Sequence, residues 1–468
     1  MNKTLLSLKR FLVANFILLS TGVYAQNTLQ QDLSKFYNEA DNMQSAVLGM
    51  SVVDLKEGNQ IVSINANKSL VPASIVKLYT TAATLHYLGA DFTYKTYVTY
   101  SGTVDVKGVL TGNIFVHGAG DPTLGSKYLR KNEGFLDTIV SMVKDAGITY
   151  ISGDLVIDCS IFDSQAIPNS WEWADLGKSY AAGVYPIAIN DNTFSISFST
   201  PELQDTLQEK IKSAPVVVNA SPFEQAIQGD DVDKDEKRGN FVVKGAIPAP
   251  QEIVGIELVQ RFIEEGLFTY KQDYIPVFIP VRNRLDTLGV FTSPSMFDIV
   301  EQTNHKSLNN YAEHLCKYLG YSVYKDGSFA KGTEVIENYF DTLGIDAGFV
   351  SIHDGSGLSR HNVTNANHMT TFLTKMYNNG GVTSHFFKSL PVASKTGTLE
   401  YYGFPAEMKG KIHAKTGSMT RVRNMAGYLI TKSGKEVAFC IMLNGFSCSP
   451  KQSRMLIVDM LEKIYNKY

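Results

Sequence analysis

The chain has 468 residues, of which 44% are hydrophobic and 19% are charged, as in ordinary globular proteins. This length is enough for two or three folded domains, and four cysteines are too few for a small disulfide-stapled scaffold. The formal net charge of −3 gives no electrostatic case for a nucleic-acid partner.

The first 25 residues have the features of a cleavable export signal. Lys3, Lys9 and Arg10 give a positive start. An apolar run over 11–19 follows. The small or apolar residues at 23–25, which end with Ala25, are suited to cleavage by signal peptidase. The run is shorter than the roughly 20 residues that a membrane-spanning helix needs. We therefore expect cleavage after Ala25 and a mature chain, without a transmembrane segment, that is periplasmic or otherwise extracytoplasmic.

The residues after this signal predict a short helix, a hairpin and a longer helix. The short helix is expected over 32–42. Two strands over 47–55 and 60–65 are joined by a tight turn and form the hairpin. The longer helix begins near Ser74 and ends at Gly89, and its apolar residues recur at helical spacing.

The hydrophobic pattern of the sequence changes over residues 92–285. Short alternating segments such as 94–100, 108–117 and 153–158 predict strands, and 134–147 predicts a helix. This stretch is therefore expected to be a β-rich insertion. Its charged run over 229–238 is expected to be a solvated loop, because its acidic residues lack the regular spacing of a metal site.

The C-terminal part of the chain predicts helices followed by a strand-rich end. Helical patterns cover three segments: 293–320, 330–343 and 364–378. Strands are expected at 411–418, 425–431 and 436–443, with a final helix at 450–465. Because strands occur near both ends of the chain, we expect an α+β fold with one antiparallel sheet assembled from both termini.

Three short motifs that carry reactive side chains occur in a fixed order. Ser74-x-x-Lys77 places a hydroxyl and an amine on one helix face, because residues three apart are neighbours there. Serine becomes a nucleophile when a base removes its proton. Lysine can be that base when burial or nearby positive charge lowers its pKa. Ser307-Leu308-Asn309 and Lys415-Thr416-Gly417 follow, and the ordered trio is typical of penicillin-binding proteins and serine β-lactamases.

Further segments at 118–124, 354–360 and 390–393 resemble one family. The chain is similar to the class C low-molecular-mass penicillin-binding proteins, the D-alanyl-D-alanine carboxypeptidase/endopeptidase family (penicillin-binding protein 4-like). The resemblance implies a serine β-lactamase/DD-peptidase-like fold. Its peptidase domain would comprise 26–91 and 286–468, and 92–285 would be a β-rich insertion with two nested subdomains.

The resemblance also implies an activity and a set of site residues. The enzyme would be a serine DD-carboxypeptidase, and also a DD-endopeptidase, that acts on peptidoglycan stem peptides and is acylated by β-lactams. Ser74 would be the nucleophile, Lys77 its base and Ser307 the relay that returns a proton to the leaving amine. The substrate-binding residues would come from the second and third motifs and the position after them: Asn309, Lys415, Thr416, Gly417 and Ser418. Positive charge on Lys415 would also lower the pKa of Lys77.

Other features of the sequence are consistent with this interpretation or leave alternatives open. A second Lys-Thr-Gly triplet begins at Lys395, but it precedes a loop pattern, whereas Lys415 lies in an alternating strand pattern. Motifs for zinc or a dinucleotide are missing, so we expect no metal and no cofactor. The sequence leaves open whether Cys440 and Cys448 form a disulfide. The alternative functions are a serine β-lactamase and a catalytically inactive wall-binding module.

Overall fold

The computed structural model describes residues 29–40, 43, 45–198, 232–235, 240–281, 284–379 and 382–468. The predicted export signal and most of the charged run at 229–238 lie outside these ranges. The chain divides into two compact units. Unit 1 consists of Met1–Ile75, Phe340–Ser351 and Asn362–Tyr468, and unit 2 consists of Val76–Tyr339 and Ile352–His361.

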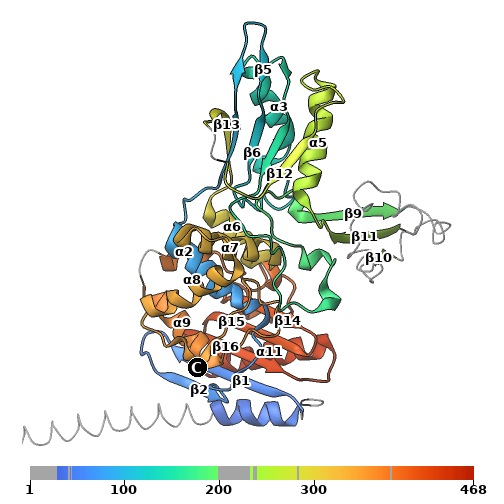
Figure 1. The fold of residues 1–468 in the computed structure, drawn as a ribbon. Coiled ribbons are helices and arrows are strands. Elements are labelled where there is room, and N and C mark those ends of the chain that lie inside the picture. The colour runs from blue at the N-terminus through green and yellow to red at the C-terminus, as the bar shows by residue number, and fades with distance from the viewer. Residues whose placement is uncertain are drawn as a thin grey trace, which may run out of the picture. The chain divides into compact units, whose positions relative to one another are not determined.

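Unit 1 is built on one five-stranded antiparallel sheet whose strands come from both ends of the chain (Figure 1). In spatial order the strands are β14 (Ile412–Met419), β15 (Val422–Ile430), β16 (Glu436–Asn444), β1 (Val47–Asp54) and β2 (Gln60–Ile64). The β1–β16 ladder joins the N-terminal hairpin to the C-terminal one, with Met50 opposite Ile441. This confirms the predicted α+β fold and its sheet assembled from both termini.

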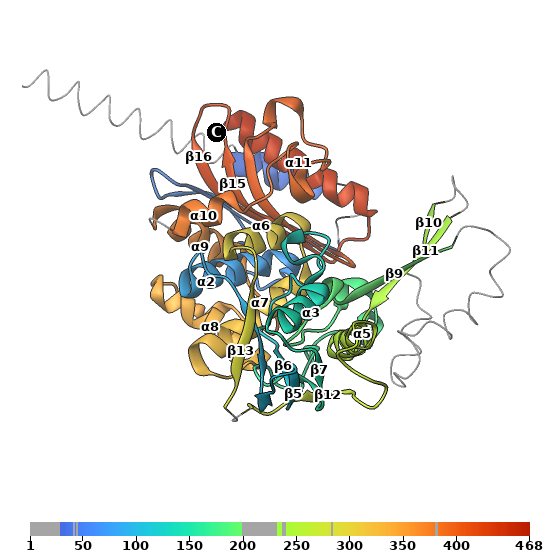
Figure 2. The same ribbon diagram turned by 90° about the horizontal axis from the view of Figure 1, so that it is seen from above.

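Helices cover both faces of this sheet. On one face, Met50 and Val52 of β1 share a hydrophobic core with the helix at 29–39 and with α11 (Pro450–Lys467). Side chains alternate along a strand, so Ser51 points to the other face. There its hydroxyl contacts that of Thr370 on α9 (Ala366–Asn378) at 2.7 Å. Figure 2 shows α11 and α9 on opposite sides of β15 and β16, with α10 (Val382–Lys388) beside α9.

The β-rich part of unit 2 has a second five-stranded sheet, which is mixed. Its strands, in spatial order, are β12 (Tyr274–Val277), β8 (Leu155–Asp158), β6 (Ile114–His117), β3 (Lys95–Tyr100) and β13 (Asp286–Thr292). The helices α3 (Phe135–Asp145) and α5 (Pro250–Glu264) share its hydrophobic core. A smaller sheet contains β4 (Thr103–Val104), β5 (Val109–Thr111) and β7 (Tyr150–Ile151). The sequence did not predict α5.

A three-stranded sheet corrects one expectation. Its strands are β10 (Val232–Asp235), β11 (Asn240–Ala246) and β9 (Thr193–Phe198). The solvated loop expected over 229–238 is therefore wrong for β10. Pairing with β11 gives its backbone N–H and C=O groups the partners that an extended segment needs.

The other part of unit 2 is a group of helices. These are α2 (Lys77–Leu88), α6 (Met296–Lys306) and α7 (Asn309–Tyr324), followed by α8 (Phe329–Thr342), whose last residues belong to unit 1. α2 packs against both α6 and α7. The single helical pattern over 293–320 is thus two helices. They separate at Ser307, which has a positive φ of 57° that ends α6.

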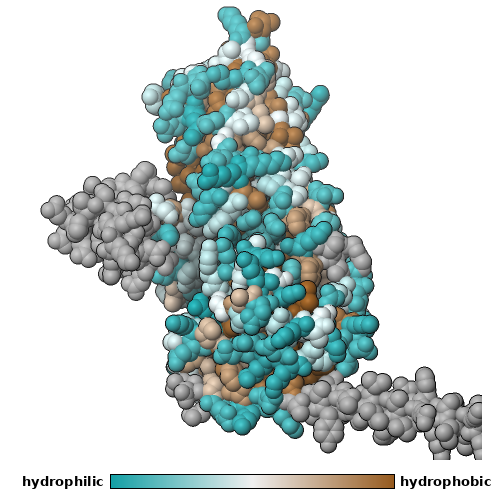
Figure 3. Space-filling model, turned by 180° about the vertical axis from the view of Figure 1, so that it is seen from behind, coloured by the Kyte–Doolittle hydropathy of each residue, from teal (hydrophilic) through white to brown (hydrophobic). Residues whose placement is uncertain are grey.

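The surface of the β-rich part of unit 2 mixes hydrophilic and hydrophobic residues (Figure 3). The exposed hydrophobic side chains include Phe278 and Ile279, just after β12. Within the described ranges, no helix combines the length and apolar character that crossing a bilayer requires. All four cysteines are free thiols.

Candidate active site

Ser74 lies at a strained, mostly buried turn. From Pro72 to Leu85, Ser74 is the only residue that is not buried. Ala73 before it has a φ of 50°, a left-handed conformation that costs energy in a residue with a Cβ atom. The turn η1 (Ala73–Val76) leads directly into α2, so Lys77 follows Ser74 after one helical turn. The fold therefore leaves one hydroxyl accessible on a buried segment.

Within unit 1, strand β14 passes close to the backbone of Ser74. A Cβ atom on Gly417 would lie 2.8 Å from the carbonyl oxygen of Pro72 and 3.1 Å from the backbone nitrogen of Ser74. Real Cβ atoms essentially never come within 3.0 Å of a backbone atom, so the contact with Pro72 requires glycine unless the backbone shifts. Gly417 therefore allows the third motif to approach the first.

Two asparagines hold the segment that precedes Ser74. The side-chain amide of Asn424 on β15 donates to the carbonyl groups of Val71 and Pro72, at 2.9 and 2.7 Å. The side-chain oxygen of Asn444 on β16 accepts the backbone N–H of Val71 at 2.9 Å. These bonds tie the turn to the central strands of the sheet. The sequence motifs did not identify either asparagine.

The two Lys-Thr-Gly triplets have different environments in unit 1. Lys415 lies in β14, is fully buried and donates from Nζ to the carbonyl oxygen of Thr416 at 2.9 Å. Lys395 is exposed and precedes the short turn η9 (Gly397–Leu399), as the loop pattern predicted. The two segments meet where the Thr416 hydroxyl donates to that of Thr398, at 3.1 Å. Thr398 was not a predicted site residue.

Lys77 is buried in unit 2 with neutral oxygen atoms around its amine. Its side chain is fully buried. Nζ donates to the side-chain oxygen of Asn309 and to the carbonyl oxygen of Ser356, both at 2.6 Å. Burial lowers the pKa of Lys77 to about 7, against the opposing effect of the Asp354 and Glu313 carboxylates. Of the two causes that the sequence allowed, burial and nearby positive charge, burial is thus the main one.

The loop that contacts Lys77 is held by two buried carboxylates. Glu313 on α7 accepts the backbone N–H groups of Gly355 and Ser356, at 2.9 and 2.8 Å. Asp354 accepts the backbone N–H groups of residues 357 and 359, at 2.7 and 2.6 Å. It also accepts the indole N–H of Trp171 at 2.8 Å. This loop is the family-like segment at 354–360, and its folding presents the Ser356 carbonyl to the amine.

The charge of Glu313 is weakened by its surroundings. Burial, followed by the charge of Asp354, raises the pKa of Glu313 above its ordinary value. The ionised form of Glu313 is therefore less favoured than that of a carboxyl group in water. Glu313 lies four residues after Asn309, on the same face of α7. That spacing is the signal by which the sequence could have identified it.

The second motif occupies the connection between α6 and α7. Ser307 ends α6, Leu308 precedes α7 and Asn309 is the first residue of α7. The two ends of the Asn309 side chain are engaged, because its oxygen accepts Lys77 and its nitrogen donates to the carbonyl of Tyr180 at 2.8 Å. Asn309 therefore links the predicted base to the chain segment of the expected insertion.

The predicted site residues fall into two sets. Unit 1 contains Ser74, Lys415, Thr416, Gly417 and Ser418. Unit 2 contains Lys77, Ser307 and Asn309. The structure brings Gly417 next to Ser74 in the first set, and Lys77 into contact with Asn309 in the second. Among the described residues, no cluster of three or more His, Cys, Asp or Glu side chains suits a metal ion.

Comparisons with known proteins point to one family. The model of the D-Ala-D-Ala carboxypeptidase 3 (S13) family matches residues 29–464. The chain is 26% identical to the D-alanyl-D-alanine carboxypeptidase of Actinomadura sp. (strain R39), over 90% of this chain and 81% of that protein. It is 27% identical to the D-alanyl-D-alanine carboxypeptidase DacB of Haemophilus influenzae, over 93% of both chains. 

A solved structure shares the fold. The crystal structure of penicillin binding protein 4 from Haemophilus influenzae superposes with a TM-score of 0.76 at 24% sequence identity. The match covers 93% of this chain and 98% of that chain. The likeness therefore extends over the β-rich part of unit 2 as well as the sheet of unit 1.

Proposed function

The chain belongs to the D-Ala-D-Ala carboxypeptidase 3 (S13) family, and we propose that it acts through an acyl-enzyme on Ser74. Family membership makes it a serine-type DD-carboxypeptidase. Its substrates are the stem peptides of peptidoglycan, whose terminal D-Ala-D-Ala bond it cleaves. The observation that carries our proposal is the buried amine of Lys77, one helical turn after an accessible serine.

The lowered pKa gives Lys77 the properties of a base. A lysine with the ordinary pKa of 10.5 would be neutral in about one molecule in 3,000 at pH 7. With a pKa of about 7, about half of the molecules carry a neutral amine. Only the neutral amine can accept the proton of the Ser74 hydroxyl. Burial therefore increases the population of the active form by about a thousandfold at this pH.

The other motif residues complete the reaction that we propose. Ser74 Oγ attacks the carbonyl carbon of the penultimate D-Ala while Lys77 Nζ accepts the hydroxyl proton. The carbon–nitrogen bond then breaks, Ser307 passes a proton to the leaving amine, and free D-Ala departs. Water attacks the resulting ester, releases the shortened peptide and restores the serine.

The third motif and Asn309 would bind the substrate and the charge that develops on it. The ammonium of Lys415 and the hydroxyl of Thr416 would bind the terminal carboxylate. Asn309 would bind the substrate amide. The backbone N–H groups of Ser74 and Ser418 would stabilise the oxyanion, with Gly417 permitting the close approach of the strand.

We extend the proposal to cross-links, β-lactams and location. The same acyl transfer would cleave a D-Ala–diamino acid cross-link, which is DD-endopeptidase activity, and would acylate Ser74 with penicillin. An extracytoplasmic location follows from the substrate and the predicted signal peptide. We also propose the peptidase domain as 26–91 and 286–468, with 92–285 as the insertion. The family match does not favour a β-lactamase or an inactive wall-binding module.

Covalent labelling tests the proposal directly. The full chain is incubated with benzylpenicillin, and the labelled peptide is identified by mass spectrometry beside a measurement of D-Ala release from a soluble pentapeptide. We expect one adduct on the peptide that contains Ser74, and neither adduct nor D-Ala release in Ser74→Ala. The control is Ser141→Ala, which removes an exposed hydroxyl on α3 and should be labelled like the wild type. An adduct elsewhere, or none on folded protein, refutes the proposal.

A further inference from the structure

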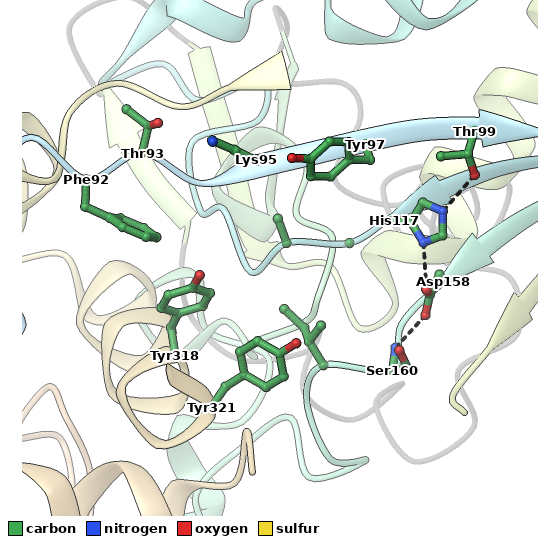
Figure 4. Close-up of a pocket in the computed structure, with 13 residues that line it drawn as sticks. Phe92, Thr93, Lys95, Tyr97, Thr99, His117, Asp158, Ser160, Tyr318 and Tyr321 are labelled. Atoms are coloured by element: carbon green, nitrogen blue, oxygen red, sulfur yellow. Dashed lines mark hydrogen bonds and ion pairs between the residues drawn. The ribbon is translucent and has the colours of Figure 1, made fainter. Parts of the chain in front are cut away.

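A cavity in unit 2 is lined by none of the predicted catalytic or substrate-binding residues. Its volume is about 820 Å³, within the range of roughly 300–1,000 Å³ that small-molecule sites occupy. β3 forms one wall, α7 forms the opposite wall, and the ends of β6 and β8 close one end (Figure 4). Gly118 and Ala119, from the family-like segment at 118–124, also line it.

Four aromatic side chains face this cavity: Phe92, Tyr97, Tyr318 and Tyr321. Tyr318 and Tyr321 lie three residues apart on α7, so they share one helix face, and their ring centroids are 5.9 Å apart. Tyr97 lies on β3 opposite them and is 40% exposed (Figure 4). The faces of aromatic rings carry partial negative charge and attract C–H groups that carry partial positive charge. These rings offer stacking surfaces on two sides of one hollow.

The end of the cavity carries a chain of oriented polar groups (Figure 4). His117 Nδ1 lies 2.8 Å from Asp158 Oδ2, and His117 Nε2 lies 2.9 Å from the Thr99 hydroxyl. The backbone N–H of Ser160 donates to the other oxygen of Asp158 at 3.0 Å. Burial alone would raise the pKa of Asp158, but the hydrogen bonds from His117 and Ser160 outweigh it and lower the pKa. The carboxylate is therefore an ionised acceptor at neutral pH.

These features argue against other ligand classes. A peptide that adds a strand needs an unpaired sheet edge. β3 pairs with β13 along its length and with β6 over Val98–Tyr100, so only Lys95–Tyr97 lack a partner strand on the β6 side, which is shorter than an ordinary strand. A polyanion such as a nucleotide needs several cations, whereas the cavity combines one lysine, Lys95, with the carboxylate of Asp158. A ligand with flat C–H faces and hydroxyl groups around its rim fits tyrosine rings on two sides and oriented polar groups at one end. Those are the surfaces of a sugar ring.

We propose that this cavity binds the glycan strand of peptidoglycan. Amino-sugar rings would stack on Tyr97, Tyr318 and Tyr321, and their hydroxyl groups would bond to the chain of Thr99, His117 and Asp158. Lys95 would pair with the lactyl carboxylate of a muramic acid residue. The inference rests on the proposed function, because that glycan is the part of the same polymer to which the stem peptides are attached.

The experiment measures binding of peptide-free glycan to the full chain. Peptidoglycan is treated with an amidase and a muramidase, and the resulting tetrasaccharide is titrated by isothermal calorimetry. We expect saturable binding by the wild type and about tenfold or weaker binding by Tyr97→Ala and Tyr321→Ala. Tyr270→Ala is the matched control, because Tyr270 is 92% exposed in the same part of unit 2 and does not line this cavity.

A second ligand distinguishes binding of the sugar rings from binding of the lactyl carboxylate. A chitin tetrasaccharide has amino-sugar rings but no lactyl group. Lys95→Gln should weaken binding of the muramic-acid tetrasaccharide and leave binding of the chitin fragment unchanged. Thermal melts establish that each variant is folded. Tyr97→Ala decides the case if Tyr321→Ala does not fold, because truncation of a half-exposed side chain removes little packing.

The outcomes separate this inference from the proposed function. Wild-type protein that is acylated at Ser74 but does not bind the tetrasaccharide overturns the inference alone. Equal affinity in the wild type and folded Tyr97→Ala overturns it as well, and so does binding that requires the stem peptide. Tetrasaccharide binding without acylation by benzylpenicillin overturns the proposed function and supports the glycan site.

Discussion

Replacing Asp354 with asparagine should allow the enzyme to work at lower pH. The negative charge of Asp354 raises the pKa of Lys77, and it is the larger of the two carboxylate effects on that amine. Removing the charge therefore lowers the pKa of Lys77 below its wild-type value of about 7. A base with a lower pKa stays neutral to a lower pH, so the acidic limb of the acylation rate moves down the pH scale.

The size of the effect follows from the fraction of neutral amine. With a pKa of about 7, roughly 9% of wild-type molecules have neutral Lys77 at pH 6, and acylation should run at about a tenth of its plateau rate. A midpoint lowered to pH 6 would raise that fraction to one half, which is about a fivefold gain. The amide also loses acceptor capacity toward the N–H groups of Trp171, Gly357 and Ser359, at a stability cost of about 1–3 kcal/mol.

The assay is the second-order rate of acylation by benzylpenicillin between pH 5 and pH 9. The rate of each variant at each pH is divided by its own plateau rate. A change in the overall rate then does not hide a change in the pH at which the rate is half its plateau. Asp121→Asn is the matched control, because Asp121 is a buried carboxylate that accepts a backbone N–H and does not act on the pKa of Lys77. A midpoint for Asp354→Asn at or above that of the wild type would refute the reasoning.

Two further substitutions test the third motif. Gly417→Ala should slow acylation by about 10²-fold or more, because its Cβ would meet the Pro72 carbonyl at 2.8 Å and displace the strand. Gly348→Ala, whose nearest contact is a side-chain oxygen at 3.1 Å, should keep the wild-type rate, and equal rates for both variants would contradict the clash. Lys415→Ala should raise the KM for a D-Ala-D-Ala peptide, whereas Lys395→Ala should not. The reverse result would mean that the triplet beginning at Lys395, and not that at Lys415, binds the terminal carboxylate of the substrate.

Features that depend on short stretches of sequence were predictable. The alternating pattern at 411–418 predicted β14, and the apolar runs on either side of the turn at Ser433-Gly434 predicted β15 and β16, so these strands lie close to their predicted bounds. The reactive side chains were recognised for a related reason. Each motif is local, with its members at most three residues apart.

Features that depend on contacts across the chain were not predictable. Asn424 and Asn444 bind the segment before Ser74 from strands about 350 residues later, and no local pattern marks them. β10 lies in a charged run whose composition favours a loop, and only its partner β11 makes it a strand. The sequence indicated burial and nearby positive charge as two causes that lower the pKa of Lys77, but not which of them dominates, because burial is a property of the folded helices and not of the spacing Ser-x-x-Lys.

The environment of Lys77 shows how a fold can bury a lysine without fixing its charge. A carboxylate in direct contact would favour the ammonium form and would remove its ability to act as a base. The amine instead contacts two neutral acceptors, the Asn309 side chain and the Ser356 carbonyl. Glu313 stands one peptide group further away, where it binds the N–H of Ser356. The carboxylates of Glu313 and Asp354 thus fix the position of the Ser356 carbonyl, which accepts a hydrogen bond from the Lys77 amine. Burial can therefore dominate the pKa of Lys77.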